Sequence, residues 1–597
     1  MEKEERRRHT EEARIIEEPA THAQTETTVA ELTEVLEKLK IYETHHTNVA
    51  DAISSALDDT DRIDPRNMGF DDEPRTWKEA QASSEAKEWT KGYLDELKSL
   101  KEMGVYKLVP RSSVPAGAKI RKGCPVFTRK RDENGNVVHH KVRLVFKGFE
   151  QIYGKDYTMT TSPTARMESW RILLHLAAAL DWNSKQTDVK TAFLYSLLPD
   201  DEVQWMEQPE GMEEEGFEDY VWMLQRGLYG MKQAGRLWNK TMDAAMIEWG
   251  FTRLSSESCI YYRRTESGIV IAVVHVDDFL SIADSEEENK RFEAQMATRW
   301  IISSLGEPKF CIGIAIKRNR ADRTVTLSQT ALIDKIIIQF GQREAHPIST
   351  PMDAGLKLRR PPPGSITPTE REKLSKLPYQ SLVGCLIYLA VGTRFDISYA
   401  VQQLSQFFDC YTYAHWNAAI RVVRYLKGTR ELKLTLGGET DLRLVGYTDS
   451  DWANCLDTRR SVGGFGFTLG AGLISWNTKK QKTVASSSCE AEYTAAFEAS
   501  KEAIWLRTLL MELKFIHPST PTTILCDNNA AICLSSDPSM HSRVKHIDIQ
   551  YHFLRERVQN KELALSYINT KDNIADIFTK ALTPGPFTRL RSFGGLR

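Results

Sequence analysis

The stretch from Ile269 to Asp284 constrains the fold most, because it sets two adjacent acids between two apolar, β-rich runs. Such runs predict two strands joined as a hairpin, with Asp277 and Asp278 at its tip. Two like charges side by side repel one another unless a cation holds them, and Mg²⁺ or Mn²⁺ suits a site made only of oxygen ligands. Asp is also a common turn residue, so a plain polar turn is the alternative unless a third acid joins the pair.

Length and composition limit the remaining choices. A chain of 597 residues predicts three or four domains, and 41% hydrophobic with 27% charged residues is typical of globular protein. The net charge of -2 means that any nucleic-acid surface must be local. Nine cysteines without a CxxC pair argue against a disulfide framework or zinc module. We expect a soluble, intracellular protein without a membrane partner, since neither a signal peptide nor a long apolar segment is present.

Changes in sequence texture divide the chain into four regions. Residues 1–73 contain few aromatics and predict a mostly disordered leader. An amphipathic helix after Trp77 opens a folded region that we assign to residues 74–345. Clustered Pro and Gly near residues 357–370, followed by apolar helices, predict a linker and a helical connection over 346–440. Alternating strands and helices predict an α/β domain with a mixed sheet over 441–597.

Further acids follow apolar segments in both folded regions. Asp188 lies in the β-compatible run QTDVKTAFL, so separated strands can supply it and the Asp277-Asp278 pair to one site. Three such acids can hold two cations, activate a 3′-hydroxyl and stabilise a phosphoryl-transfer transition state. Each acid taken alone is better explained as a helix cap or a turn residue, and it is their joint arrangement that favours a metal site. In the last region the same pattern suits two-metal phosphodiester hydrolysis and comprises Asp449, Glu492, Asp527 and Asp576.

Several motifs in a fixed order resemble the reverse transcriptase and ribonuclease H portion of a copia-type LTR-retrotransposon polyprotein. The resemblance covers about Trp77 to Leu582. It implies an α+β multidomain fold, with a right-hand polymerase of fingers, palm and thumb over 74–345, a connection over 346–440 and an α/β ribonuclease H-like domain over 441–597. Its carriers are KVRLVFKGFEQIYGKDY, QTDVKTAFL, VQWMEQPEGM, LYGMKQAGRLW, HVDDFL, YQSLVGCLIYLA, YTDSDWA, ISWNTKKQKTVASSSCEAEY and RVKHIDIQYHFLRE.

For the polymerase, the resemblance implies catalytic and metal-binding roles for Asp188, Asp277 and Asp278. Phe193 matches the bulky residue that would crowd a ribose 2′-hydroxyl and so favour dNTPs. The remaining matches are substrate-binding residues. Lys141 and Arg143 are expected near the incoming triphosphate, and their positive charge suits phosphate. A loop and the start of a helix are expected to line the nascent base pair, through Gly230, Lys232 and Gln233. Taken without the family, Gly230 is better explained as an ordinary turn glycine and Lys232 as a solvated lysine.

For the ribonuclease H, the resemblance implies that Asp449, Glu492, Asp527 and Asp576 bind the metal, with Glu490 and Asp451 as close rivals. A basic run beside Trp476 suits the backbone of an RNA–DNA hybrid. A charged loop that serves only solubility is the alternative for this run. Its members are Lys479, Lys480 and Lys482.

The implied function is an RNA-directed DNA polymerase with ribonuclease H activity that copies retrotransposon RNA into cDNA. It would use two Mg²⁺ or Mn²⁺ ions per active site, and its partners would be an RNA template, a DNA primer, the RNA–DNA hybrid and dNTPs, with integrase and particle proteins of the same element. We expect a cytoplasmic, virus-like-particle location, with nuclear entry open. The alternative is a decayed or co-opted fragment that binds nucleic acid without turnover, because His275 and Gly235 replace the family's usual Tyr and Pro.

Overall fold

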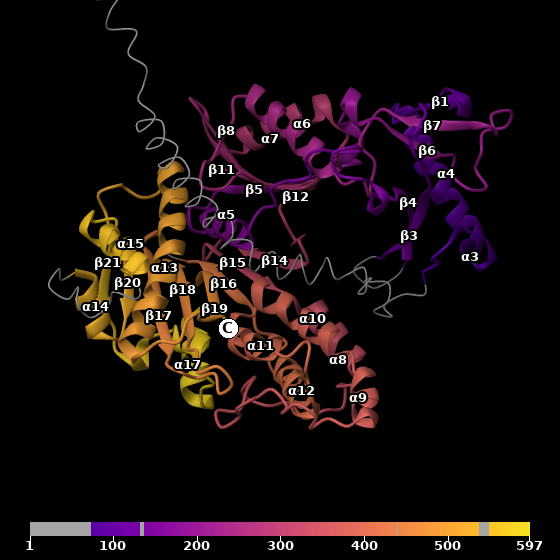
Figure 1. Ribbon diagram of the computed structural model, residues 1–597. Helices are drawn as coiled ribbons and strands as arrows, with labels where there is room; N and C mark the ends of the chain where they lie inside the picture. The colour runs from indigo at the N-terminus through magenta and orange to yellow at the C-terminus, as the bar shows by residue number, and fades with distance from the viewer. Residues whose placement is uncertain (1–72, 132–136, 439, 537–547) are drawn as a thin grey trace, which may run out of the picture. The chain divides into compact units, whose positions relative to one another are not determined.

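The structure is a computed structural model that describes residues 73–131, 137–438, 440–536 and 548–597. Nearly all of the predicted leader, residues 1–73, lies outside the described residues. Glu73–Arg597 forms one compact unit, coloured from indigo to yellow along the chain in Figure 1. In this described part the strands form five sheets, which with the surrounding helices make a mixed α and β architecture.

The described chain opens with two helices, two strands of a four-stranded sheet and a β-hairpin; the sheet has the order β1-β7-β6-β2 and is completed by two strands from later in the chain. The first helix begins at Trp77 and is capped by Thr76, whose hydroxyl accepts a hydrogen bond from Glu79 N–H at 3.2 Å. The second helix buries Trp89 and Tyr93 against Phe127 of the hairpin. The elements are α3 (Trp77–Ala82), α4 (Ala86–Glu102), β1 (Tyr106–Pro110), β2 (Ile120–Arg121), β3 (Gly123–Arg131), β4 (Val137–Phe146), β6 (Gln204–Glu207) and β7 (Tyr220–Leu224).

A six-stranded antiparallel sheet of order β12-β5-β11-β10-β9-β8 carries the first group of acids. The predicted hairpin is present, since β10 and β11 pair antiparallel with His275 opposite Asp278. The elements are α5 (Met167–Ala179), β5 (Asn183–Val189), α6 (Ala234–Glu248), β8 (Thr252–Arg253), β9 (Ile260–Thr265), β10 (Gly268–His275), β11 (Asp278–Ala283), α7 (Glu286–Arg299) and β12 (Ile302–Gly306).

Helices cover both faces of this sheet, which explains why its central strands are apolar throughout. Because side chains alternate along a strand, Ile271 and Val273 of β10 lie in the core that contains α5 residues, whereas Ala272 and Val274 lie in the core that contains α6 and α7 residues. Figure 1 shows α6 and α7 on one side of these strands and α5 on the other. The hairpin that carries the acids is thus anchored on both faces.

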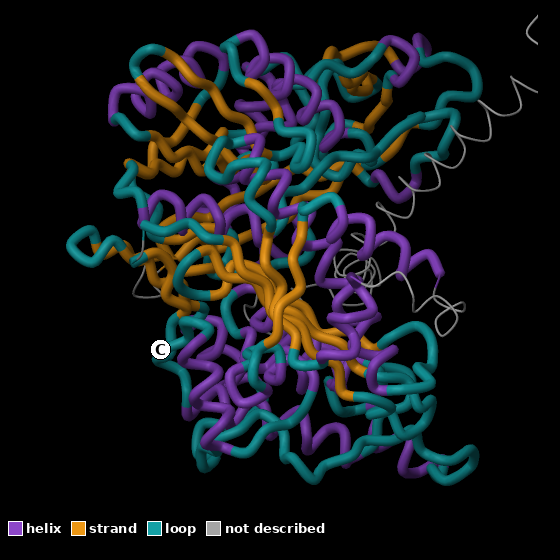
Figure 2. The backbone as a smooth tube through the Cα atoms, turned by 90° about the vertical axis from the view of Figure 1, so that its left-hand side faces the viewer, coloured by secondary structure: helices purple, strands orange, loops and turns teal. Residues whose placement is uncertain are grey.

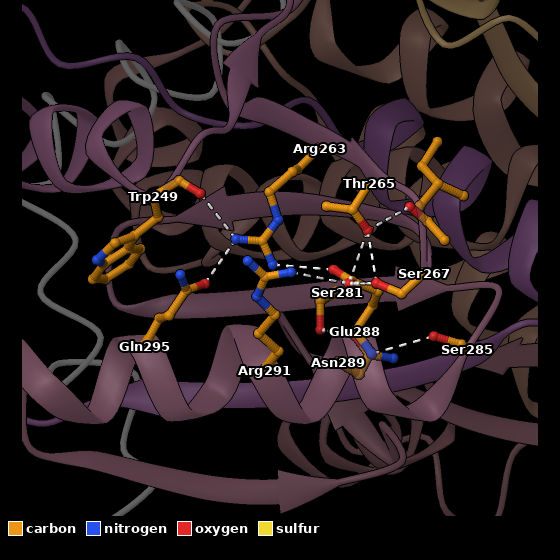
Figure 3. Close-up of polar contacts among 12 residues, drawn as sticks. Trp249, Arg263, Thr265, Ser267, Ser281, Ser285, Glu288, Asn289, Arg291 and Gln295 are labelled. Carbon is orange, nitrogen blue, oxygen red and sulfur yellow. Dashed lines mark hydrogen bonds and ion pairs between the residues drawn. The ribbon is translucent and has the colours of Figure 1, made fainter.

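A buried polar network fixes α7 to the sheet (Figure 3). Glu288, which is 1% exposed, accepts hydrogen bonds from Arg263 Nη2 at 3.2 Å and from the hydroxyls of Thr265 and Ser267 at 3.0 and 2.5 Å. The hydroxyl of Ser285 accepts the Glu288 N–H at 3.2 Å and so caps the helix. Burial alone would raise the pKa of Glu288, but these hydrogen bonds outweigh it and the pKa is lowered.

The middle of the chain contributes a second small sheet, of order β13-β14-β15-β16, and a group of helices. Strand β16 belongs to the predicted connection, yet it pairs with β15 of the region before it, so both regions build this sheet. The elements are β13 (Phe310–Cys311), β14 (Ile314–Asn319), β15 (Thr324–Ser328), α8 (Thr330–Gln339), α9 (Pro368–Ser375), α10 (Tyr379–Gly392), α11 (Ser398–Ser405), α12 (Tyr413–Gly428) and β16 (Leu434–Gly437).

In the part of the chain that the structure describes, no single helix is long and apolar enough to cross a membrane. Only α9 and α10 taken together, bent by 45° at their junction, reach the required length and composition.

The last part is a five-stranded mixed sheet of order β19-β18-β17-β20-β21, as predicted for an α/β domain. Strands β17, β18 and β19 run antiparallel, and β20 and β21 run parallel to β17. Figure 2 shows strands gathered in a twisted bundle with helices on either side. The elements are β17 (Leu444–Asp451), β18 (Val462–Leu469), β19 (Leu473–Lys480), α13 (Ser488–Glu512), β20 (Thr522–Cys526), α14 (Asn529–Ser536), α15 (Asp548–Gln559), β21 (Leu563–Tyr567), α16 (Asp576–Thr579) and α17 (Pro584–Phe593).

Two neighbouring glycines let helices approach β18 from opposite faces. A Cβ added to Gly463 would lie 3.3 Å from Ala495 of α13, and one added to Gly464 would lie 2.5 Å from Phe578 of α16. The second distance is shorter than real Cβ contacts allow, so only glycine admits α16 at this position. The close approach brings the start of α16, and with it Asp576, to the sheet.

One buried arginine joins three of these parts. Arg171 of α5 donates to the carbonyl oxygens of Ile474 in β19 at 2.7 Å and of Val391 and Gly392 in α10 at 2.6 and 3.0 Å. Its guanidinium carbon lies 3.8 Å from the ring centre of Trp476. Sequence patterns do not single out Arg171, because a basic residue in an apolar helix carries no sign of the partners that it will find.

We expect Glu288→Ala to destabilise the protein by about 3 kcal/mol, because it leaves the Arg263 guanidinium buried without its carboxylate. The pKa of the Glu288 carboxyl is lower in the folded protein than in the unfolded chain, where it is about 4.3, so its stabilisation is fully present above pH 4.3 and is lost as the pH falls through the folded pKa. The difference in the free energy of unfolding between the wild type and Glu288→Ala should therefore shrink in acid. Urea unfolding at pH 7 and pH 3 measures it, with the exposed Glu286→Ala of the same helix as the control that changes little.

Candidate functional site

The turn that presents Asp277 is held in a strained conformation. Val276 has φ 59, in the left-handed region that a β-branched residue rarely adopts. Such a conformation costs about 1–3 kcal/mol and persists only where the surroundings enforce it. Two hydrogen bonds do so here, from Trp238 Nε1 to Val276 O at 2.6 Å and from Val189 N to Asp277 O at 2.9 Å.

Three acids meet at one end of this sheet, two of them on neighbouring strands. Asp188 near the end of β5 lies opposite Asp278 at the start of β11, and Asp277 precedes Asp278 in the turn. Burial raises the pKa of Asp188, and the charges of Asp277 and Asp278 raise it further. Burial and Asp277 likewise raise the pKa of Asp278. The ionised acids repel one another, and within the described chain their oxygens do not all lie within 4.8 Å of one another.

Basic and aromatic residues surround these acids. Lys141 of β4 and Lys190 oppose the rise in the pKa of Asp188, which places both ammonium groups near its carboxylate. The guanidinium carbon of Arg143 lies 5.6 Å from the ring centre of Tyr229, and the ring of Phe193 lies 5.7 Å from the same ring in an edge-to-face arrangement.

Tyr229 was not among the predicted site residues. Burial raises its pKa, and Asp277 contributes to the rise, so the phenol is also near the acids. Its position directly before Gly230 in LYGMKQ was the available signal.

The predicted substrate loop lies tightly against the end of β4. Gly230 has φ 87, and a Cβ there would lie 2.2 Å from Phe146 O, so the position admits only glycine. Lys232 is exposed. Gln233 is buried, where its amide oxygen accepts from Gln151 Nε2 at 3.1 Å and its amide nitrogen donates to Asp156 O at 3.2 Å. The Gln233 amide is thus engaged within the protein, and its contact with substrate stays a prediction.

The two departures from the family pattern lie beside this site. Burial lowers the pKa of His275, and the charge of Asp277 only partly opposes this, so the imidazole is held neutral. Gly235 lies in the first turn of α6, where its carbonyl accepts from the Ser162 hydroxyl at 3.2 Å. Neither residue displaces the three aspartates.

Four acids of the last part form a second, tighter cluster. They come from β17 (Asp449), α13 (Glu492), the residue after β20 (Asp527) and the start of α16 (Asp576). Ligand oxygens of Asp449, Asp527 and Asp576 lie within 4.8 Å of one another, and Glu492 and Asp527 meet the same limit together with the sulfur of Cys526. The sequence thus predicted residues that the fold brings together from distant positions.

Hydrogen bonds and one ammonium group orient these carboxylates. Glu492 Oε1 accepts from Ser450 N at 3.2 Å, and Asp527 Oδ2 accepts from the Thr570 hydroxyl at 2.7 Å. The Nζ of Lys580 lies 2.9 Å from Asp576 Oδ1. Lys580 was also absent from the predicted site, although it lies only four residues after Asp576.

The cluster is short of positive charge. Burial, with the charges of Asp449 and Asp527, raises the pKa of Glu492 to about 9. Burial and Asp449 raise the pKa of Asp576 to about 7, and burial raises that of Asp449. A group of closely spaced oxygen donors whose ionisation is suppressed by burial and by one another's charge fits a divalent ion such as Mg²⁺ or Mn²⁺.

The two rival acids make other contacts. Glu490 Oε2 accepts from the backbone N–H and the hydroxyl of Ser486 at 2.7 and 2.6 Å, just before α13. Asp451 Oδ2 accepts from the side chain of Asn454. Asp451 still helps to raise the pKa of Asp449, so it lies close to the cluster without being one of its four acids.

The predicted hybrid-binding lysines point in different directions. Lys479 and Lys480 are consecutive in β19, so their side chains leave opposite faces of the strand. Lys480 Nζ donates to Gln406 Oε1 at 2.5 Å, whereas burial lowers the pKa of Lys479, which lies near Glu498. Lys482 is exposed beyond the strand. A contact between these lysines and nucleic acid stays a prediction.

Replacing Trp238 by Phe should remove the hydrogen bond to Val276 O that holds the strained turn. We expect a loss of about 1–3 kcal/mol in the free energy of unfolding, because a partly buried carbonyl is left without its donor. Guanidinium chloride unfolding measures it. Trp249→Phe is the matched control, since it lies in the same aromatic cluster and leaves the turn unchanged. Equal losses in both variants would contradict a specific role for the Trp238 donor.

Glu492→Gln should stabilise the metal-free protein increasingly as the pH rises from 5 to 9. A carboxyl with a raised folded pKa binds more protons in the folded state, so stability falls with rising pH above the unfolded value of about 4.3. At pH 8 we expect a gain of at least about 1.4 kcal/mol, the equivalent of one pKa unit. Thermal unfolding in EDTA across this range tests it, and Glu490→Gln should lack the trend.

Comparison with known proteins relates the chain to a known family. The family described as "Reverse transcriptase (RNA-dependent DNA polymerase)" matches residues 104–354, which include the first group of acids. The chain is 38% identical over 530 residues to the "Retrovirus-related Pol polyprotein from transposon TNT 1-94" of Nicotiana tabacum, covering 88% of this chain and 39% of that polyprotein. It is 37% identical over 462 residues to the Pol polyprotein from transposon RE2 of Arabidopsis thaliana, covering 77% and 31%.

A solved structure of the "foamy viral protease-reverse transcriptase dRH in complex with ds DNA" is similar with a TM-score of 0.44 and 12% identity, covering 81% of this chain and 70% of that one. The chain spans between 31% and 39% of the length of the two polyproteins that it matches. On the family match, residues 104–354 belong to the reverse transcriptases, and the identity with these relatives makes the chain a homologue of retrotransposon Pol polyproteins.

Proposed function

We propose that the chain is an RNA-directed DNA polymerase with its active site at Asp188, Asp277 and Asp278. The observation that carries the proposal is the pairing of β5 with β11, which sets Asp188 opposite Asp278 beside the turn that bears Asp277. Membership of the reverse transcriptase family supports the same activity. In this proposal the six-stranded sheet is the palm, and helices α3 and α4, the β3-β4 hairpin and the four-stranded sheet are the fingers.

The residues around the acids have roles that their positions suit. Lys141, near Asp188, and Arg143, over Tyr229, would bind the triphosphate of an incoming dNTP. The Phe193 ring, packed edge-to-face on Tyr229, would crowd a ribose 2′-hydroxyl and so select dNTPs. Gly230 and the exposed Lys232 would lie along the nascent base pair, since the loop is fixed against β4 next to these residues.

We further propose that Asp449, Glu492, Asp527 and Asp576 form a ribonuclease H site in a ribonuclease H-like domain. Supporting it are the mixed five-stranded sheet and the convergence of four acids from separate elements on one small volume. Lys479 and Lys482 would contact the backbone of the RNA–DNA hybrid. Lys480 would first have to leave Gln406.

Both sites would hold Mg²⁺ or Mn²⁺, two ions per site, bound by the acids just named. The bound ions would neutralise charge that develops on the phosphoryl group during transfer or hydrolysis. In both sites the chain itself holds the carboxylates in place, through the Val276 turn in one and through Ser450 and Thr570 in the other.

The substrates in this proposal are an RNA template, a DNA primer and the hybrid that copying generates. Integrase and particle proteins of the same element are proposed partners, and a cytoplasmic virus-like particle, with later entry of the product complex into the nucleus, is the proposed location.

Two substitutions should separate the activities. With a primed RNA template, dNTPs and Mg²⁺ or Mn²⁺, Asp277→Asn should reduce primer extension at least about a hundredfold and leave hybrid cleavage, because each metal-binding acid supports several kcal/mol of charge stabilisation. Asp449→Asn should have the reverse effect. Asp201→Asn, at an exposed acid, is the control that changes neither.

A folded wild-type protein that extends no primer under any of these conditions would overturn the polymerase assignment. Cleavage of the RNA–DNA hybrid without primer extension would instead indicate a nuclease that does not polymerise DNA. Binding of the hybrid without either reaction, unaffected by Asp277→Asn and Asp449→Asn, would instead support a co-opted fragment that binds nucleic acid without turnover.

A further inference from the structure

A lysine lies inside the second acid cluster, where the family resemblance supplies only acids. Lys580 Nζ is 2.9 Å from Asp576 Oδ1 and 3.6 Å from Asp449 Oδ2. The preceding residue, Thr579, donates its hydroxyl to the same Asp449 oxygen. Two consecutive residues thus hold Asp449, and the ammonium group occupies space between two of the acids that would bind a metal.

The local structure explains this placement. Helix α16 is a single turn from Asp576 to Thr579, and Lys580 follows it directly, four residues after Asp576. The side chain of Lys580 is 33% exposed, whereas those of Asp449 and Asp576 are 3% and 10% exposed. The lysine therefore has a path to solvent that the acids lack, and a long flexible stem on which to move along it.

One ammonium group does not neutralise four carboxylates. Asp449, Glu492, Asp527 and Asp576 gather around this single ammonium group, so negative charge remains in excess. A divalent ion can balance that excess. That ion and the ammonium group would compete for the same oxygens of Asp449 and Asp576.

We propose that Lys580 is a built-in counter-cation of the second acid cluster, which holds Asp449 and Asp576 together without metal and withdraws toward solvent when a divalent ion binds. It acts as a positioning residue that sets the cation concentration the site requires. The inference rests on the proposed metal-dependent function of this cluster and deepens it.

Removal of the Lys580 charge should lower the stability of the metal-free protein and raise its affinity for a divalent ion. Without metal, Asp449 and Asp576 lose their shared cation, so the folded protein becomes less stable. With metal, the ion no longer displaces an ammonium group, so it binds more tightly. A lysine with a merely structural role would produce only the first effect, and a lysine that helped to bind metal would weaken cation affinity.

The test uses the full chain carrying Asp188→Asn, Asp277→Asn and Asp278→Asn, so that Mn²⁺ binding reports the second cluster. In this background we expect Lys580→Met to tighten Mn²⁺ binding, followed by electron paramagnetic resonance, on the order of tenfold, as expected for removal of a nearby unit charge. In EDTA the same variant should unfold a few degrees lower. Lys580→Arg should match the parent on both measurements, and Lys571→Met, at an exposed lysine, should change neither.

Unchanged or weaker Mn²⁺ binding by Lys580→Met would overturn the proposal, and Lys580→Gln gives a second reading if the Met variant does not fold. The result separates from the proposed activity. If Lys580→Met binds Mn²⁺ more tightly but the protein with Lys580 cleaves no hybrid, the ribonuclease H assignment is overturned and the role of the lysine stands. If the protein with Lys580 cleaves the hybrid but Lys580→Met leaves the Mn²⁺ affinity unaltered, the role of the lysine is overturned and the ribonuclease H assignment stands.

Discussion

Mutual repulsion between carboxylates in partly buried positions is the constraint on which the rest of this structure depends. Both acid clusters bring together groups that would separate if the surrounding chain allowed it. Burial first, and the neighbouring carboxylates second, raise the pKa values of Asp188, Asp278, Glu492 and Asp576. The scaffold resists this repulsion in two ways. At the first cluster it uses a strained turn held by hydrogen bonds, and at the second it uses helices packed closely against a sheet with a lysine among the acids.

Periodic features of the sequence were sufficient to predict the hairpin, the mixed sheet and the acids that converge. Apolar runs around Asp277 and Asp278 specify strands buried on both faces, and the acids stand where those strands end. The same reasoning placed Asp449 and Asp527 at one sheet. Family resemblance was needed to choose Glu492 over Glu490, because both occur on the same helix. What distinguishes them is contacts that the sequence does not reveal: Ser486 donates to Glu490, whereas Ser450 donates to Glu492, which also lies near Asp527.

Contacts made across long sequence separations could not be predicted in this way. Tyr229, Lys580 and Arg171 carry no periodic signal, and their roles come from the neighbours that folding supplies. The burial of Gln233 depends on Gln151, more than eighty residues away, and the engagement of Lys480 depends on Gln406. The division at residues 345 and 346 was drawn from composition, which is blind to the pairing of β16 with β15 across it.

Arg171 and the shared sheet have a consequence for how such elements evolve. A guanidinium with 1% exposure that reaches carbonyl groups of β19 and α10 makes three stretches of chain mutually dependent. Recombination could replace the stretch that contains β19 by the corresponding stretch of a distantly related retrotransposon. The new stretch would have to preserve the backbone path at Ile474 and the ring of Trp476, because otherwise the Arg171 guanidinium would be buried without its partners. The regions built around the six-stranded and the five-stranded sheet are therefore poor candidates for modular exchange and are better viewed as one inherited block.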